Sequence, residues 1–204
     1  MARDYSYRSQ WPITFERIQH FTPEDMNRFK RFADFAIQHK QQYIEVESAT
    51  TVPWPLVAVI HRRESDADFN TYLGNGQRLS MRTTIEPIGR GPFSSFLEGC
   101  VDALKIDGLT GVHQKTDVWR LGQEWGSWPI EKMLLYAEKL NGLGYFFKGL
   151  PSPYVWGGTN IQVKGKYVSD GNFDANVMDT QPGCAPILWM MGHLDTSIHF
   201  TREN

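Results

Sequence analysis

A glutamate at the end of an apolar stretch is the residue of this sequence best suited to acid catalysis. The motif Pro53-Trp54-Pro55 predicts the start of a short, mostly buried helix that continues through Ile60 and ends near Glu64. Neighbouring side chains and the negative end of the helix dipole would both favour the protonated carboxyl group. Such an acid can give its proton to the departing oxygen of a glycosidic bond. The competing interpretation is a surface Glu64 that pairs with Arg62 or Arg63.

The residues after this glutamate predict a small β element. Phe69 to Leu73 and Met81 to Ile85 contain strand-forming residues, and Gly74-Asn75-Gly76 is a turn signal between them. Proline and glycine end the segment from Pro87 onward. We therefore expect a hairpin or small sheet from Asp68 to about Pro87, directly after the helix that carries the glutamate.

Glycoside cleavage usually requires a second carboxylate, and its identity is open. An inverting enzyme needs a base that holds a water, and a retaining enzyme needs a nucleophile closer to the acid. Asp66 and Asp68 are near in sequence, but we interpret both as facing solvent, and Glu86 would lie on the far strand. A mechanism with one carboxylate is also compatible with the sequence.

Helical spacing of apolar residues dominates the rest of the chain. Thr22-Pro23-Glu24-Asp25 predicts the start of one long amphipathic helix that reaches Tyr43. Other predicted elements are helices around Leu97 to Leu104, Pro129 to Leu140 and Pro186 to Leu194, and a short strand pair around Ile161 to Val168. We expect an α+β fold, mainly α, in a single domain over 1–204 with a helical N-terminal region to about residue 50 and no separate binding module.

The composition excludes several classes of function. The 204 residues are 41% hydrophobic, enough for one sizeable core, and the formal charge of -2 comes without a basic block, so nucleic acid is not an expected partner. The apolar runs are short and the N-terminus is polar, so we expect a cytoplasmic protein with no signal peptide and no membrane insertion. The two cysteines and six histidines have no metal-ligand spacing, so we expect no metal and no cofactor.

The passage from Glu64-Ser65 through Phe69-Asn70-Thr71 to the Gly-Asn-Gly turn resembles the helix-to-hairpin passage of lysozymes. In those enzymes the catalytic glutamate closes a helix and a β hairpin forms the facing wall. The resemblance implies a lysozyme-like fold with the glutamate as general acid. Several lysozyme families carry an aspartate on the hairpin, where this sequence has Gln77. Gln77 with Thr83 or Thr84 could instead orient a water, as a threonine does in phage-type lysozymes.

A second block is similar to goose-type lysozymes and lytic transglycosylases. The segment from Tyr136 to Tyr145 resembles their Asn-Ala-Gly region and its following tyrosine. In those families the asparagine or the tyrosine lines the sugar cleft opposite the glutamate. The resemblance therefore implies Asn141, Gly142 and Tyr145 as cleft residues.

The stretches 52–93 and 128–185 also resemble uncharacterised lysozyme-like proteins of bacteria and their phages. The shared features are Asn75-Gly76, Arg82-Thr83, Gly89-Arg90 and Ser152-Pro153-Tyr154-Val155-Trp156. We expect Asn75, Thr83, Tyr154 and Trp156 to contact sugar, and His61 to lie near the site, one helical turn before the glutamate. The alternatives are a buried core role for His61 and a core-filling role for the two aromatic residues.

These resemblances imply a bacteriolytic, antimicrobial peptidoglycan hydrolase. It would be a muramidase, or lysozyme, of the endolysin type that cleaves the β-1,4 bond between N-acetylmuramic acid and N-acetylglucosamine. It would act as a monomer on the glycan strand of the bacterial cell wall, either after release from the cytoplasm or as part of a virion. The alternatives are a lytic transglycosylase, in which one glutamate is acid and then base, a chitinase of the same superfamily, and a non-catalytic phage structural or glycan-binding protein.

Overall fold

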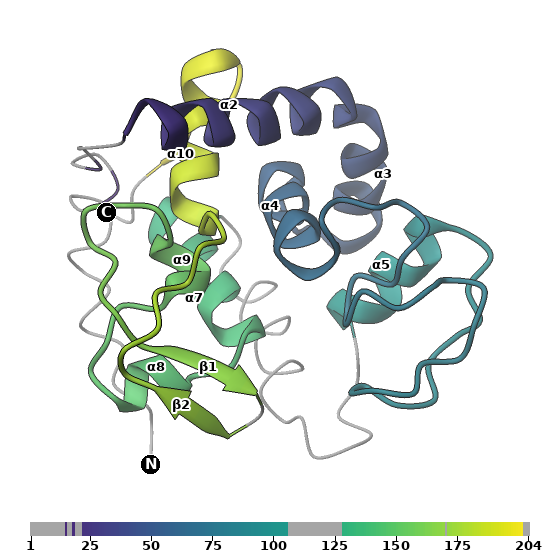
Figure 1. Ribbon diagram of the computed structural model, residues 1–204. Helices are drawn as coiled ribbons and strands as arrows, with labels where there is room; N and C mark the ends of the chain where they lie inside the picture. Colours follow the sequence, from purple (N-terminus) through teal and green to yellow (C-terminus); the bar gives the residue numbers. More distant parts are fainter. Residues whose placement is uncertain (1–14, 16–17, 19–21, 106–127, 170, 202–204) are drawn as a thin grey trace. The chain divides into compact units, whose positions relative to one another are not determined.

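The computed structural model describes residues 15 and 18 and residues 22–105, 128–169 and 171–201 (Figure 1). This part of the chain contains eight helices and one antiparallel sheet of two strands, which confirms an α+β fold that is mainly α. None of its helices has the length and the apolar character needed to cross a membrane. The chain divides into two compact units, one of residues 1–34 and 129–204 and the other of residues 35–128.

From residue 22 onward, the N-terminal helical region contains two helices, α2 (Pro23–Gln38) and α3 (Lys40–Thr50). The prediction of one long helix through Tyr43 was therefore wrong. The helices separate at His39, whose backbone has φ -102° and ψ 18°. The ring of His39 stacks on Phe35 with centroids 4.1 Å apart, and its Nδ1 lies 2.8 Å from the Phe35 carbonyl oxygen. These local contacts favour a break at this residue.

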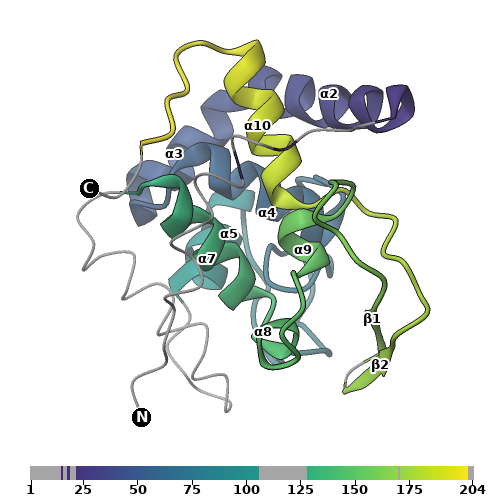
Figure 2. The ribbon, with the colours of Figure 1, turned by 90° about the vertical axis from the view of Figure 1, so that its left-hand side faces the viewer.

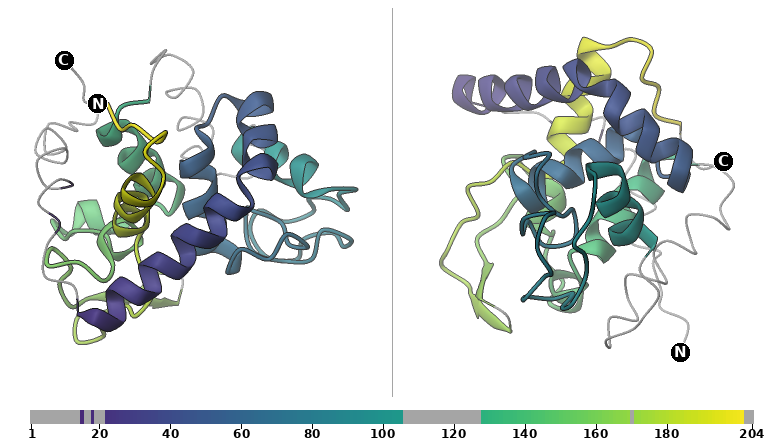
Figure 3. Two further views of the ribbon diagram at one scale, coloured as in Figure 1. Left: turned by 90° about the horizontal axis from the view of Figure 1, so that it is seen from above. Right: turned by 90° about the vertical axis from the view of Figure 1, so that its right-hand side faces the viewer.

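The described part of the unit of residues 35–128 contains the end of α2 and three further helices. Helix α3 packs against α4 (Trp54–Ser65) and α5 (Phe96–Lys105), as Figure 3 shows. Every residue of α4 from Trp54 to His61 is buried, as its apolar run predicts. The predicted helices that end near Glu64 and that span Leu97 to Leu104 are thus confirmed.

The segment between α4 and α5 is a series of turns, and the predicted hairpin is reduced to one antiparallel bridge between Thr71 and Arg78. Farther along the segment, the side chain of Gln77 accepts the backbone hydrogen bonds that a partner strand would accept in a hairpin. The backbone N–H groups of Thr84 and Ile85 donate to Oε1 of Gln77, at 2.8 and 3.2 Å. Backbone donors that are satisfied by a side chain do not require a ladder of strand hydrogen bonds, which explains why the strands do not form.

The other unit contains α7 (Ile130–Leu140), α8 (Gly144–Phe147), α9 (Pro153–Trp156) and α10 (Cys184–Leu194). Helices α7, α9 and α10 pack against one another (Figure 2). The helices predicted at Pro129 to Leu140 and at Pro186 to Leu194 are confirmed, and α10 begins two residues before its proline. Cys100 of α5 and Cys184 of α10 are both buried.

The only sheet of the described residues is formed by β1 (Lys166–Ser169) and β2 (Asn172–Asp174), visible as a short ribbon in Figure 2. Tyr167 pairs with Phe173 in the antiparallel register. The strand pair was predicted around Ile161 to Val168, so its position is shifted toward the C-terminus. Gly165 has φ +127° and interrupts the extended chain just before β1.

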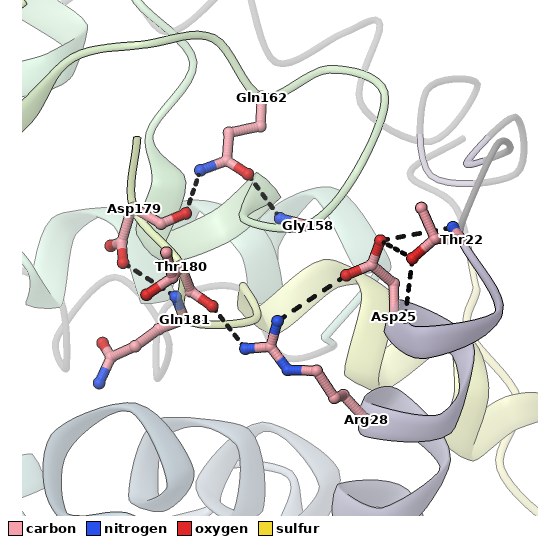
Figure 4. Close-up of polar contacts among 8 residues, drawn as sticks. All are labelled: Thr22, Asp25, Arg28, Gly158, Gln162, Asp179, Thr180 and Gln181. Carbon is pink, nitrogen blue, oxygen red and sulfur yellow. Dashed lines mark hydrogen bonds and ion pairs between the residues drawn. The ribbon is translucent and has the colours of Figure 1, made fainter. Parts of the chain in front are cut away.

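Polar contacts connect the start of α2 to the long segment that carries β1 and β2 (Figure 4). The Thr22 hydroxyl accepts from the N–H of Asp25 at 3.1 Å, which confirms the predicted N-cap. Arg28 lies 3.8 Å from Asp25 and donates to the Thr180 carbonyl oxygen. The carboxylate of Asp179 is buried and pairs with Lys166 at 3.2 Å. The start of the helix and this segment therefore form one polar network.

Candidate functional site

Glu64 lies in the last turn of α4, and its side chain is half-buried. The helix ends because Asp66 and Ala67 adopt left-handed conformations, with φ 56° and 60°. Their N–H groups donate to the carbonyl oxygens of Arg62 and His61, each at 3.2 Å. The carboxylate of Asp66 forms an ion pair with Arg62 one turn earlier. Glu64 therefore lies at a helix C-terminus whose backbone is fixed by these hydrogen bonds and by the ion pair.

The predicted Gly-Asn-Gly turn lies directly against this helix end. Gly76 has φ +73°, and a Cβ atom added to it would be 2.8 Å from the backbone carbonyl oxygen of Glu64. The turn is closed by the N–H of Gly76, which donates to the Tyr72 carbonyl oxygen at 2.8 Å. Only glycine combines this backbone conformation with so close an approach. The residue after the turn, Gln77, is thereby held close to the backbone that carries the candidate acid.

Gln77 and Thr84, the two residues proposed from the sequence to orient a water, are hydrogen-bonded to each other. Nε2 of Gln77 donates to the Thr84 hydroxyl at 2.9 Å, while Oε1 of Gln77 accepts from the Thr84 N–H. Asn75 joins the same group, since its Nδ2 donates to the Ile85 carbonyl oxygen at 3.0 Å. Thr84 is exposed, and its hydroxyl keeps a proton and a lone pair with which to hold a water.

Thr83 was predicted to contact sugar, but it has a buried position at the base of a loop. Its hydroxyl donates to the Pro87 carbonyl oxygen and accepts from the N–H of Arg90 at 2.9 Å. Its own N–H donates to the Arg90 carbonyl oxygen, also at 2.9 Å. Because the side chain is only 3% exposed, Thr83 acts in this structure as the residue that closes the loop from 83 to 90.

His61 occupies a core position beneath the end of α4. It has no exposed surface, its Nδ1 lies 3.0 Å from the Tyr43 hydroxyl, and its ring contacts Phe69 and Phe96 with centroids 4.9 and 4.5 Å away. Burial lowers the pKa of His61 from 6.5 to about 4, against the smaller opposing effects of the backbone and carboxylate of Asp68. A neutral imidazole in an aromatic cluster matches the core role that the sequence left open.

The other carboxylates near Glu64 in sequence have local roles. Asp68 accepts from the N–H and from Nδ2 of Asn70, each at 2.9 Å, and these hydrogen bonds lower the pKa of Asp68. Asp66 is exposed and paired with Arg62 at the helix end, and Glu86 is exposed on the loop from 83 to 90. The contacts of Asp66 stabilise the end of α4, and those of Asp68 stabilise the turn that follows it.

The sequence did not single out Asp102, which joins α5 to the turns. The Tyr72 hydroxyl donates to Oδ2 of Asp102 at 2.7 Å, and Nε of Arg90 donates to the same oxygen at 3.0 Å. A second nitrogen of Arg90 donates to Oδ1, so the pair is bidentate. The Gly89-Arg90 motif was noted in the sequence, but its partner lies 12 residues further on and has no local signature.

The remaining predicted cleft residues belong to the other unit. Asn141 is exposed at the C-cap of α7, whereas Tyr154 and Trp156 of α9 are 3% and 2% exposed. Tyr145 of α8 is buried, and its hydroxyl accepts from the N–H of Tyr167 at 3.1 Å. In the present conformation these three aromatic side chains fill the core, which is the alternative that the sequence left open for Tyr154 and Trp156.

Among the described residues, no group of three or more His, Cys, Asp or Glu side chains is arranged to hold a metal ion. Comparison of the whole chain with protein-family models, curated proteins and solved structures finds no significant match.

Proposed function

We propose that this chain is a peptidoglycan muramidase with a lysozyme-like catalytic region and Glu64 as its general acid. The observation that carries the proposal is the position of Glu64 at the closed end of a buried helix, with the Gly76 turn against its backbone. Gln77 follows this turn directly and is hydrogen-bonded to Thr84. The exposed hydroxyl of Thr84 is available to a water. Glycoside hydrolysis needs an acid for the leaving oxygen and a group that directs water, and in this proposal the Gln77–Thr84 pair takes the second role, which a carboxylate usually has.

In this mechanism Glu64 gives its proton to the glycosidic oxygen as the bond to the anomeric carbon breaks. A water held by the Thr84 hydroxyl adds to that carbon and releases a proton to solvent, from which the Glu64 carboxylate regains the proton that it gave. Gln77 fixes the Thr84 hydroxyl by donating to its oxygen, so that the remaining O–H and lone pair keep one direction. The substrate is the bond between N-acetylmuramic acid and N-acetylglucosamine in the wall glycan.

Lytic transglycosylation of the same bond is the second candidate. It is favoured by the contacts of Asp66 with Arg62 and of Asp68 with Asn70, because neither aspartate then has the position of a second catalytic carboxylate and a mechanism with one carboxyl group fits. In that reaction Glu64 first protonates the leaving oxygen. Its carboxylate then takes the proton of the muramic C6 hydroxyl, and this oxygen closes an anhydro ring in place of water.

The proposal is tested by lysis of purified peptidoglycan with the wild type and with Glu64→Gln. The amide has nearly the same volume but cannot donate a proton as an acid, so the rate should fall at least about a hundredfold while the chain stays folded. Glu86→Gln makes the same change at an exposed glutamate and should keep the wild-type rate. Equal lysis by wild type and Glu64→Gln would exclude Glu64 as the acid, and cleavage of chitin without cleavage of peptidoglycan would favour the chitinase alternative.

A further inference from the structure

Asp102 is the meeting point of two segments that each carry one member of the Gln77–Thr84 pair. Its side chain is 17% exposed, and that of Arg90 is 26% exposed. Its two oxygens accept the bidentate donation of Arg90 and the hydroxyl of Tyr72. Charge-assisted bidentate pairs fix geometry more tightly than single neutral hydrogen bonds. Asp102 therefore sets the position of both donors.

Arg90 leads from Asp102 to Thr84. Its backbone forms a reciprocal pair with Thr83, in which each N–H is satisfied by the other residue, at 2.9 Å in both cases. This pair closes the loop from 83 to 90 at its base. Thr84 follows Thr83 directly in the chain. A displacement of the Arg90 backbone would therefore move Thr83 and, with it, Thr84.

Tyr72 leads from Asp102 to Gln77. The N–H of Tyr72 donates to the Gln77 carbonyl oxygen at 2.6 Å, and the ring of Tyr72 stacks on Phe93 with centroids 5.0 Å apart. The hydrogen bond to Asp102 raises the pKa of Arg90, and burial followed by the same carboxylate raises the pKa of Tyr72. Both groups thus remain donors throughout the pH range in which enzymes of this kind would work.

We propose that Asp102 is a positioning residue that holds the Gln77–Thr84 pair in the geometry needed to orient a water, acting through Tyr72 on one side and Arg90 on the other. The catalytic part of this inference rests on the proposed function, whereas the structural part does not. Asp102 itself donates nothing to the substrate. Its role is to keep the Thr84 hydroxyl in one place.

The structural part is tested by amide hydrogen exchange, resolved by residue, in the wild type and Asp102→Asn. The asparagine keeps the volume but loses the charge and one acceptor, so the N–H groups of Thr84 and Ile85 should exchange at least about tenfold faster. The N–H of Gly165, which donates to Val177 in the other unit, should be unaffected. Unchanged exchange at Thr84 and Ile85 would overturn the proposal, whether or not the protein is an enzyme.

The catalytic part is tested by steady-state kinetics on soluble fragments of purified peptidoglycan, at a temperature where all variants are fully folded. Asp102→Asn should lower kcat about tenfold with little change in KM, and adding it to Thr84→Ala should cause no further loss, because both changes act on one water. Asp179→Asn, a buried carboxylate in the other unit, should lower thermal stability without changing kcat. Additive losses in the double variant would contradict the positioning role, while inactive wild type would reject the proposed function and leave the exchange result to decide.

Discussion

At the scale of single residues, His61 makes the stability of the protein depend on pH. Its imidazole is fully buried, and its pKa is about 4 in the folded protein against 6.5 for an ordinary histidine. The unfolded chain therefore binds a proton more tightly than the folded one between these values. The contribution of His61 to the free energy of unfolding is fully present above pH 6.5. It is lost as the pH falls toward 4, and the total loss is about 3 kcal/mol.

This dependence is measurable by urea unfolding at several pH values between 7 and 4. His61→Gln should remove most of the decrease in the free energy of unfolding over this range, although the variant will be less stable at pH 7. His199→Gln changes an exposed histidine and should leave the decrease as it is in the wild type. A wild-type slope in the His61 variant would show that another group causes the dependence.

At the scale of elements, the contact between the 74–77 turn and the end of α4 can be tested with two glycines. Gly76 and Gly89 both have positive φ, 73° and 80°, but a Cβ at Gly76 would meet the Glu64 carbonyl oxygen, whereas one at Gly89 would have nothing within 4 Å. Gly89→Ala should cost about 1 kcal/mol, mainly from the backbone conformation. Gly76→Ala should cost about 2 kcal/mol more and should reduce wall lysis.

Thermal unfolding and lysis rates of the two alanine variants provide the comparison. Equal destabilisation would mean that the turn can move away from α4 at no cost, and the candidate site would then lose its close connection between Gly76 and Glu64.

The helices were predictable because their own residues determine them. Helices α4, α5, α7 and α10 each have apolar positions that the structure buries, and Thr22 and Asp25 mark the start of α2 by a local hydrogen bond. The segment between α4 and α5 was not predictable in the same way. Its shape depends on side chains such as Gln77, which binds backbone groups seven and eight residues away, and no periodic pattern records such contacts.

At the scale of the whole molecule, the candidate site residues are divided between the two compact units. Glu64, Asn75, Gln77 and Thr84 belong to the unit of residues 35–128, whereas Asn141, Tyr145, Tyr154 and Trp156 belong to the other. Glu64 and its helix were predictable, because an apolar run that ends in an acid is a local signal. Asp102 was not, because Tyr72 and Arg90, its partners, lie 30 and 12 residues away. The functional proposal rests on the group around Glu64.

The most direct test of the central claim is mass spectrometry of the fragments that the wild type and Glu64→Gln release from purified peptidoglycan. The account predicts that the wild type releases fragments that end in reducing N-acetylmuramic acid and that Glu64→Gln releases almost none. Fragments lighter by one water would instead identify the transglycosylase reaction. If the wild type released no glycan fragments, or if Glu64→Gln released the same fragments at the same rate, the claim that Glu64 is the acid of a muramidase would be contradicted.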